Sequence, residues 1–251
     1  MPPEDAAKDP WARLRQATRA RIGLGRAGDA MRIGDVLDFQ FAHAMARDAV
    51  HTRLDVATLR AALPGALEVH SEARDRETYL RRPDLGRRLA PDCLPVLPKG
   101  DYDAALVIAD GLSATAVMQN AVPMLETVTE RLQGFKLAPP IIATQARVAL
   151  GDDIGEALGV KLVAVLIGER PGLTVSDSLG IYLTFNPKRG TLDSARNCIS
   201  NVHAHGGLSY GAAADMLAWL MREALRRGLT GVGLKEASGL THEGAMPLAA
   251  G

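Results

Sequence analysis

The sequence predicts an α/β protein with a mostly parallel sheet and helices on both faces, preceded by a smaller helical N-terminal domain. From residue 104 onward, short apolar runs alternate with segments of helical periodicity, the order expected of strands joined by crossover helices. The apolar runs, of which 162–167 (LVAVLI) is the clearest, do not alternate between apolar and polar residues. Strands of this kind are typical of parallel sheets that are buried on both faces.

The first part of the chain is predicted to be helical. Residues 11–21 are compatible with a helix and rich in arginine, and a glycine-rich turn separates them from an amphipathic pattern over 34–51. A shorter helix is predicted over 56–63. The apolar face of the 34–51 helix consists of Leu37, Phe41, Ala44 and Met45, at helical spacing.

Four prolines between residues 83 and 98 mark a change in the pattern. Prolines at this density stop helices and central strands, so we place a domain boundary near Pro98. The chain then divides into a helical N-terminal region (1–97), expected to contact a partner, a sheet domain (98–235) and a C-terminal tail (236–251). The first ten residues are expected to form a loose leader.

The sheet domain is predicted to begin with a strand over 104–109. The helix that follows begins near Ser113, a suitable capping residue, and runs toward residue 134 with an interruption or kink at Pro123. A second long helix, over 208–228, has one apolar stripe and stops at Gly228. Further strands are expected over 142–148, 162–167 and 181–185, with a short helix after the first of these and an edge strand over 230–235.

The composition is that of an ordinary globular protein, with 251 residues, 29 basic and 29 acidic side chains. Balanced charge gives no general attraction to nucleic acid or to anionic membranes. No apolar run approaches the roughly 20 residues of a membrane span, and the N-terminus lacks the features of a secretory signal. The two cysteines, Cys93 and Cys198, form no metal or redox spacing motif and suit a reducing cytoplasm.

Three loops at predicted strand ends are candidates for a binding site, because ligands of open parallel sheets bind beyond the carboxyl ends of the strands. The loops are 110–113 (DGLS), 168–172 (GERPG) and 186–207, which contains Cys198. Their glycines let the backbone approach a ligand closely. Glu169 and Arg170 bring opposite charges to the end of a buried strand. The alternatives are a solvated loop pair for these two residues and a small buried side chain for Cys198.

A glycine-rich motif upstream does not fit a dinucleotide site. Gly23–Gly28 (GLGRAG) matches G-x-G-x-x-G, and Asp48 follows twenty residues after the last glycine. Such a fingerprint needs a strand before the glycines, and here the preceding pattern is an arginine-rich helix.

The histidines give only weak signals. His43 and His51, with Arg47 between them, share a helix face that is expected to be solvated or to face a partner. His203 and His205 are a weak hint of a metal site, since no further ligand follows by spacing. We find no P-loop, nucleophile elbow or catalytic triad, and the sequence predicts neither a catalytic residue nor a metal ligand of its own.

Eight motifs in a fixed order resemble a known family. They are ARIGLGRAG, FQFAHAMARDAVH, RPDLGRRL, IADGLSATAV, RVALGDDIGEALG, LIGERPGLTVSDSLG, RNCISN and GGLSY. Together they make the chain, over roughly 11–235, similar to the small subunit of ethanolamine ammonia-lyase. Any one of these motifs alone would be weak, whereas their combination is specific.

The resemblance implies a function and a cofactor. Ethanolamine ammonia-lyase converts ethanolamine to acetaldehyde and ammonia with adenosylcobalamin, and the family's large subunit is a TIM barrel that binds ethanolamine and the adenosyl group. The family's small subunit has a helical N-terminal part and a Rossmann-like domain that covers the cobalamin from the other side. Cobalamin is bound base-on in the family, in agreement with the lack of a D-x-H-x-x-G sequence here. The chain alone would be inactive.

The resemblance also implies which residues contact the cofactor. The family's valine before G-D-D-I-G-E matches Val148, its glutamate in G-E-R-P-G-L matches Glu169, and its cysteine in R-x-C-I-S-N matches Cys198. Gly168 and Arg170, which flank the glutamate, complete the predicted cofactor-binding set. A carboxylate only accepts hydrogen bonds and the side-chain amides of cobalamin donate them, so Glu169 is expected to accept from the cofactor.

Two other functions are weighed against this one: an NAD-dependent oxidoreductase that uses Gly23–Gly28, and a non-catalytic cobalamin- or nucleotide-binding protein. A cytoplasmic location is expected. The chain begins almost at the first motif, without the long extension that directs some relatives into bacterial microcompartments, which argues against encapsulation. Contact with the large subunit is predicted for a basic stripe, which comprises Arg13, Arg19, Arg21, Arg26, His43 and Arg47.

Overall fold

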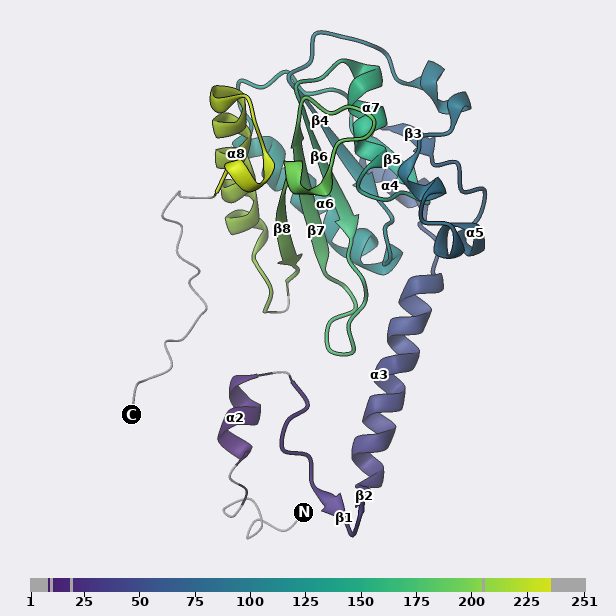
Figure 1. Cartoon of the computed structure of the whole chain (residues 1–251), viewed down its shortest axis with the longest axis vertical. Helices are drawn as coiled ribbons and strands as arrows, with labels where there is room; N and C mark the ends of the chain where they lie inside the picture. Colours follow the sequence, from purple (N-terminus) through teal and green to yellow (C-terminus); the bar gives the residue numbers. More distant parts are fainter. Residues whose placement is uncertain (1–8, 10, 19, 205, 236–251) are drawn as a thin grey trace.

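The chain forms a sheet domain and an arm that projects from it in the computed structural model, which describes residues 9, 11–18, 20–204 and 206–235 (Figure 1). The predicted leader, apart from Asp9, and the predicted tail lie outside the described residues, as do Arg19 and His205. The arm consists of α2 (Ala12–Ala17), the two-stranded hairpin of β1 (Arg26–Ala27) and β2 (Ala30–Met31), and the long helix α3 (Ile33–His51).

The sheet has six strands in the order β3-β5-β4-β6-β7-β8. The first four strands in this order are parallel, β7 runs antiparallel to β6, and β8 runs antiparallel to β7. The prediction of a mostly parallel sheet is therefore confirmed. The strands are β3 (Leu67–His70), β4 (Ala104–Ala109), β5 (Ile141–Thr144), β6 (Leu162–Gly168), β7 (Leu179–Phe185) and β8 (Arg196–Val202).

Helices cover both faces of the sheet, as predicted. One buried cluster includes residues of α4 (Val56–Ala62), α6 (Ala114–Arg131) and α8 (Tyr210–Arg227). The opposite cluster includes residues of α7 (Leu150–Leu158) and of the 3-10 segment η2 (Pro91–Val96). Successive residues of β4 contribute to opposite clusters, because side chains alternate across a strand. This explains why the central strands are apolar without interruption.

Several helix ends follow directly from local chemistry. Ser113 caps α6, and its hydroxyl oxygen accepts from the Ala116 N–H at 3.1 Å. α6 continues through Pro123 to Arg131 instead of ending there. α8 ends at Gly228, whose φ of 70° lies in the left-handed region that favours glycine.

Two predictions in the C-terminal part were wrong. Residues 196–207 were expected to form a loop, but Arg196–Val202 is β8, an edge strand of mainly polar residues that carries no apolar signal. Residues 230–235 were expected to form an edge strand, but they contain the 3-10 turn η4 (Gly231–Gly233). Gly231 has a φ of 83°, and a Cβ at this position would collide with the Ser194 carbonyl, so the segment turns against β8.

The strand predicted over 142–148 is shorter than expected. It ends at Thr144, because Gln145 adopts a φ of 53°, which breaks the extended conformation. The remaining residues of that segment form a loop that leads into α7. This loop contains Val148, so the irregular backbone places a predicted site residue beyond the end of a strand.

The sheet begins before the boundary that we place near Pro98. β3 pairs in parallel with β5, with Leu67 opposite Ile141. The segment between β3 and Pro98 also contains the short helix α5 (Arg76–Arg81), whose Tyr79 is fully buried. The division at residues 97 and 98 stays a prediction, but the residues on its N-terminal side contribute a strand and a helix to the sheet domain.

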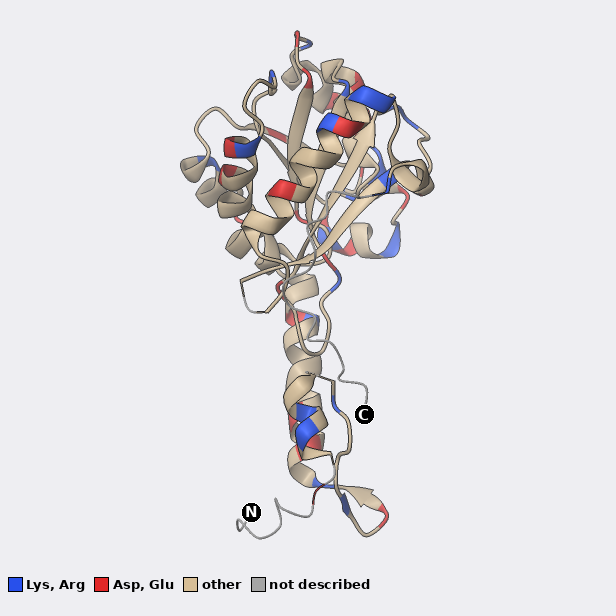
Figure 2. Cartoon of the chain, turned by 90° about the vertical axis from the view of Figure 1, so that its left-hand side faces the viewer, with Lys and Arg blue, Asp and Glu red and all other residues tan. Residues whose placement is uncertain are grey.

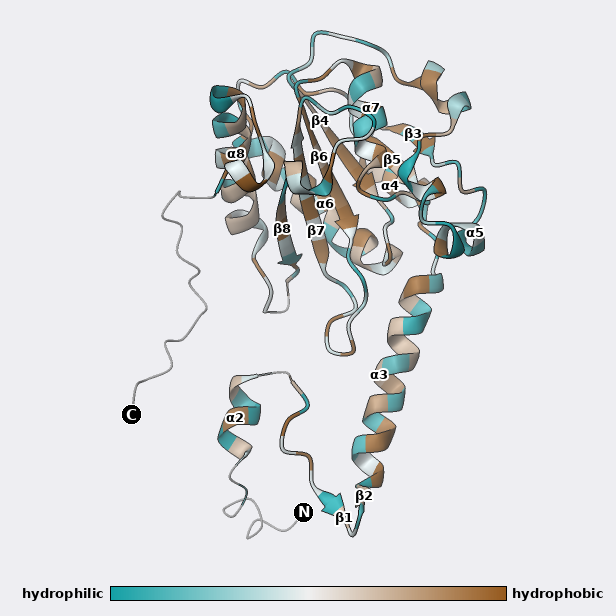
Figure 3. Ribbon diagram, in the orientation of Figure 1, coloured by the Kyte–Doolittle hydropathy of each residue, from teal (hydrophilic) through white to brown (hydrophobic). Residues whose placement is uncertain are grey.

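The apolar face predicted for the arm helix α3 is exposed to solvent (Figure 3). Phe41 is 68% exposed and Leu37 is 55% exposed, and Ala49 is the buried residue of this helix. Arg47 and His43 are exposed on other parts of the same helix. Figure 2 colours the Lys and Arg positions of the chain blue and the Asp and Glu positions red. Within the described ranges, no helix combines the length and the apolar character that a bilayer crossing requires.

The position of β6 predicts the effect of a charge at its centre. Val165 is 2% exposed and faces Gly151 of α7, so Val165→Asp buries a carboxylate without a partner. We expect a loss of several kcal/mol in the free energy of unfolding, enough to abolish soluble expression. Val232→Asp, at a position that is 79% exposed, is the matched control and should express normally. A well-folded Val165→Asp protein, judged by thermal denaturation, would contradict this account of the sheet.

Candidate functional site

A cavity of about 440 Å³ lies at the edge of the sheet where the parallel strands end. The loops after β4, β5 and β6 form its walls, together with side chains from α5 and β7. Val148, Gly168, Glu169 and Arg170, four of the five predicted cofactor-binding residues, line this one cavity. The cavity therefore lies where ligands of open α/β sheets bind.

Two glycines let the ends of β4 and β6 touch beside the cavity. Gly111 has a φ of 55°, and a Cβ there would collide with the Gly168 carbonyl oxygen. A Cβ on Gly168 would collide with the carbonyl oxygen of Ser113. The Leu112 N–H donates to the Gly168 carbonyl at 2.9 Å across this contact. Gly168 thus has a steric reason to be glycine, apart from any contact with a ligand.

Glu169 connects the ends of three strands. It follows β6, and its Oε2 accepts from the Ser178 hydroxyl at 2.7 Å and from the Asn201 N–H of β8 at 3.2 Å. Its backbone N–H donates to the Ser178 carbonyl at 3.1 Å, just before β7. Within the described part of the chain, no hydrogen bond reaches Oε1. One carboxylate oxygen thus has a structural role, and the other can accept from a ligand.

Cys198 lies on β8, opposite Tyr182 of β7, and does not line the cavity itself. Tyr182 does line it, and its side chain lies beside that of Cys198. Cys198 is an exposed residue, yet partial desolvation of its sulfur raises the pKa of the thiol; the Tyr182 contact opposes this shift, and the nearby Glu169 charge adds to it. The thiol is therefore protonated at neutral pH and is not an activated nucleophile.

Asp110 organises the loops that surround the cavity. It follows β4 and is 2% exposed, and its carboxylate accepts from the backbone N–H groups of Gln145 and Ala146 at 2.9 and 2.8 Å. Arg76 of α5 donates to the same carboxylate at 3.2 Å and to the Gly111 carbonyl at 2.8 Å. Burial raises the pKa of Asp110, while the hydrogen bond from Ala146 and the Arg76 charge oppose that shift.

Arg76 also fixes the arm to the sheet domain. Its Nε donates to the Val50 carbonyl, in the last turn of α3, at 2.8 Å. The guanidinium is 6% exposed as part of its ion pair with Asp110, so water competes little for these contacts. One side chain therefore joins the root of the arm to the loops around the cavity.

Tyr79 brings two guanidinium groups close to the cavity. The Arg147 and Arg76 guanidinium carbons lie 4.4 and 4.8 Å from the centre of its ring, and its hydroxyl donates to the Ala146 carbonyl at 3.1 Å. Among the described residues, three buried side-chain atoms nearby have no hydrogen-bond partner: Arg76 Nη2, Arg147 Nε and Gln145 Oε1. Unpaired buried polar atoms are costly, so their clustering here indicates a site built for a polar ligand.

Comparison with known proteins shows the family of the chain. Residues 8–235 match the family model described as ethanolamine ammonia-lyase light chain (EutC). The chain is 53% identical over 244 residues to the ethanolamine ammonia-lyase small subunit of Azotobacter vinelandii, which covers 92% of this chain and 90% of the relative. The small subunit of Pseudomonas fluorescens strain SBW25 is 51% identical over 244 residues, a match that covers 92% of this chain and 88% of that relative. That of Ralstonia nicotianae is 50% identical over 248 residues, with 94% and 92% covered.

The chain belongs to the ethanolamine ammonia-lyase light chain family. The resemblance inferred from the eight motifs is confirmed by a match that covers nearly all of the described residues. A light chain is one subunit of a larger enzyme, which is consistent with a strand-end cavity that lacks a nucleophile–base pair of its own.

Sequence reasoning missed several residues of the light-chain cavity. Tyr79 and Arg76 lie before the predicted domain boundary and were assigned to a separate helical region, so they were not connected with the strand ends. Arg147 directly precedes Val148 in the RVALGDDIGEALG motif, and Tyr182 follows Ile181 in a strand that was predicted. The alternation of side chains along that strand could have placed Tyr182 on one face of the sheet, but its neighbour Cys198 lies on β8, which was not predicted.

The alternative motifs do not assemble into sites within the described residues. Gly23–Gly28 precedes and enters the small β1–β2 hairpin, and no strand lies between residue 11 and Gly23. The requirement for a strand before the dinucleotide fingerprint is therefore not met. His203 is buried, with its ring nitrogen Nε2 3.1 Å from Asn201 Oδ1.

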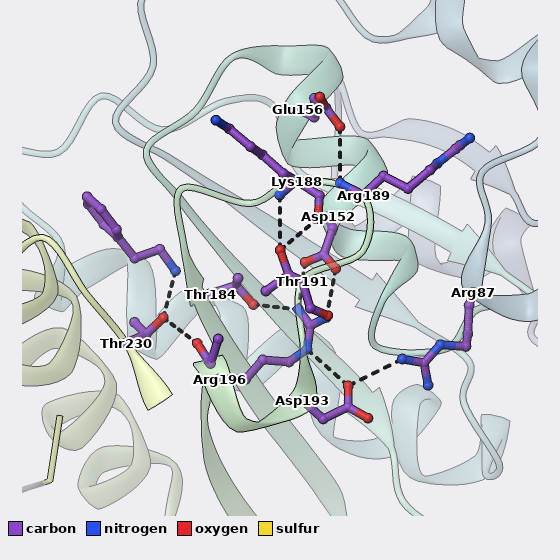
Figure 4. A network of polar contacts seen from close by, with 12 residues as sticks. Arg87, Asp152, Glu156, Thr184, Lys188, Arg189, Thr191, Asp193, Arg196 and Thr230 are labelled. Carbon is purple, nitrogen blue, oxygen red and sulfur yellow. Dashed lines mark hydrogen bonds and ion pairs between the residues drawn. The ribbon is translucent and has the colours of Figure 1, made fainter. Parts of the chain in front are cut away.

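A second buried network closes the opposite edge of the sheet (Figure 4). Arg196 of β8 makes two hydrogen bonds of 2.6 and 2.7 Å with Asp152 of α7, and both side chains are almost completely buried. The same guanidinium donates to the Thr184 hydroxyl at 2.9 Å and to the Thr191 carbonyl at 2.8 Å. All of these donors find acceptors, in contrast to the cavity edge. This edge has a structural role.

Proposed function

We propose that this chain is the subunit of an ethanolamine ammonia-lyase that holds adenosylcobalamin, base-on, against a large barrel subunit where ethanolamine is converted to acetaldehyde and ammonia. The observation that supports this most is that Val148, Gly168, Glu169 and Arg170 line one cavity at the strand ends. The residues after Pro98 would form a Rossmann-like domain, with a partner-contacting helical domain before it. We place the enzyme in the cytoplasm.

The residues of the cavity fit one side of a cobalamin. A corrin ring with its amide side chains is too large to be enclosed in about 440 Å³, so the cavity would take an edge of the cofactor and leave the rest to the large subunit. Glu169 Oε1 is free to accept from ligand amides, and the Arg147 side chain lines the same cavity and can donate to a ligand carbonyl. These two side chains match the donors and acceptors that amide side chains present.

The part of this subunit in catalysis is positional. When bound, adenosylcobalamin supplies the weak cobalt–carbon bond whose homolysis starts the radical reaction. Glu169 and Arg147 would fix the orientation of the corrin edge, while Val148, Ile167 and Tyr182 would keep water from that edge. Cys198, a protonated thiol behind Tyr182, would support the Tyr182 ring and the adjacent cofactor surface. No side chain of this subunit needs to transfer a proton.

The arm supplies a surface for the large subunit. An uncovered apolar face on an otherwise solvated helix is typical of a protein interface, and α3 has such a face at Leu37, Phe41 and Met45. Arg21 and Arg47 are exposed on the same arm, and the Arg21 guanidinium lies 3.3 Å from the Leu173 carbonyl in the loop after Glu169. A partner that binds the arm would therefore also reach the rim of the cavity.

Removing one acceptor from the cavity tests the cofactor assignment. Glu169→Gln replaces one carboxylate oxygen with an NH2 group. This group donates hydrogen bonds, so it cannot accept them from the donors of the ligand. Losing a hydrogen bond to a charged acceptor costs about 1.5–3 kcal/mol, so the cobalamin concentration for half-saturation should rise roughly ten- to a hundredfold. The measurement is cobalamin binding to the complex by equilibrium dialysis, with acetaldehyde production recorded in parallel.

Three further variants show which part of the effect is structural. Ser178→Ala removes one of the two internal partners of Oε2, keeps the Asn201 N–H and leaves Oε1 untouched, so it should change cobalamin affinity much less than Glu169→Gln does. Cys198→Ser should keep most of the turnover at saturating cobalamin, whereas the bulkier Cys198→Leu should weaken binding. Unchanged affinity in Glu169→Gln would remove Glu169 from the site, and loss of turnover in Cys198→Ser would contradict its packing role.

Charge reversal on the arm tests the assembly. We expect Arg21→Glu combined with Arg47→Glu to abolish co-purification with the large subunit. An acidic surface on the large subunit that attracts the two arginines would repel the two glutamates. Lys188→Glu combined with Arg226→Glu changes the charge equally at exposed positions of the sheet domain and should leave co-purification intact. If the arm variant still co-purifies at the level of this control, the arm is not the docking surface.

A further inference from the structure

Three side chains of metal-ligating types, none of which lines the cavity, meet at the edge strand β3. His70 ends the edge strand β3, and Asp92 and Cys93 lie in η2, which packs beside it. The imidazole, carboxylate and thiol ligand atoms all lie within 4.8 Å of one another, and His70 Nε2 is 3.5 Å from Asp92 Oδ2. About 3.3–3.7 Å separates two ligands of a tetrahedral zinc ion, given its bond lengths, so small rotations bring the three atoms to one ion.

The surroundings of His70 favour metal binding. Its Nδ1 lies 3.0 Å from the Ser71 carbonyl oxygen, to which only a protonated Nδ1 can donate. With the proton on Nδ1, the Nε2 atom, 3.5 Å from Asp92 Oδ2, is left to bind an ion between the two side chains. A ligating histidine in proteins is generally held by such a bond from its other ring nitrogen to a carbonyl or carboxylate.

Cys93 has a matching arrangement around its sulfur. The sulfur accepts from the His70 backbone N–H at 3.3 Å, a bond that stabilises negative charge on sulfur. Cys93 is 5% exposed and its thiol donates to the His70 carbonyl oxygen at 3.8 Å, so a metal ion would have to displace the thiol proton on binding. His70 and Asp92 have side chains that are 47% and 75% exposed, which gives an ion a path to the sulfur from solvent.

We propose that His70, Asp92 and Cys93 bind a divalent cation of borderline softness, with zinc as the best match. Imidazole, thiolate and carboxylate together favour zinc over calcium or magnesium, and three protein ligands leave one position for water or for a group from a partner. The ion would join β3 to η2 and close the segment 71–91. That segment contains α5, which contributes Arg76 and Tyr79 to the loops around the cavity.

Cobalt(II) is a suitable probe, since a cobalt–thiolate bond gives a charge-transfer absorption that carboxylate and imidazole ligands do not. The full chain, with its large subunit where the two co-purify, is prepared free of cobalamin, stripped with a chelator and titrated with cobalt(II). We expect a thiolate band that saturates at one ion per chain and that zinc abolishes. Its midpoint should rise at least about tenfold in His70→Gln and in Asp92→Asn, which change exposed side chains.

The cysteine variants identify the sulfur. Cys93→Ser should abolish the band, whereas Cys198→Ser, which removes the other cysteine of the chain, should retain it in full. Zinc should also raise the thermal denaturation midpoint of the wild type and of Cys198→Ser, but not that of His70→Gln. The proposal is overturned if the wild type shows no thiolate band, if the band survives in Cys93→Ser, or if His70→Gln binds as tightly as the wild type.

Discussion

Asp110 follows the central strand β4 in a position that water does not reach, where a lone carboxylate would be strongly destabilising. Arg76 of α5 supplies the opposite charge, and the N–H groups of Gln145 and Ala146 supply the remaining hydrogen bonds. Without the other, each partner would be a buried and unpaired charge. The pair therefore fixes the positions of the segments that bond to it. Arg76 holds the last turn of α3 through Val50, and Asp110 holds the loop that presents Val148. The arm and the cavity therefore share one anchor.

The two edges of the sheet differ in how completely their polar groups are paired. At the edge drawn in Figure 4, the Arg196 guanidinium is bonded to Asp152, Thr184 and Thr191, and the network closes upon itself. At the cavity edge, buried atoms of Arg147 and Gln145 have no partner within the described chain, and Glu169 keeps one oxygen free. An edge with open hydrogen-bonding capacity is suited to a ligand, and an edge without it holds the fold.

Much of this arrangement could be predicted from the sequence where the signal is local. The apolar run of β6, the Ser113 cap and the Gly228 stop lie within a few residues of the elements that they define, and strand ends in a parallel sheet meet at one edge, which brought Val148 and Glu169 together. Non-local features were not predictable in this way. β8 is polar because it is an edge strand, β3 is four residues long, and Arg76 reaches Asp110 across 34 positions. His70 and Cys93 likewise form no spacing motif, and only the pairing of β3 with the sheet brings them together.

The central claim is that the Arg76–Asp110 pair organises the cavity loops and the root of the arm together. Hydrogen–deuterium exchange of the assembled enzyme carrying Asp110→Asn tests it most directly, with Asp152→Asn, which breaks the equally buried pair at the opposite edge, as the matched control. The account predicts faster amide exchange at 145–148 and at the last turn of α3 in Asp110→Asn, with 184–196 unchanged, and the reverse pattern in Asp152→Asn. Unchanged exchange at 145–148 in Asp110→Asn, or the same pattern in both variants, would contradict it.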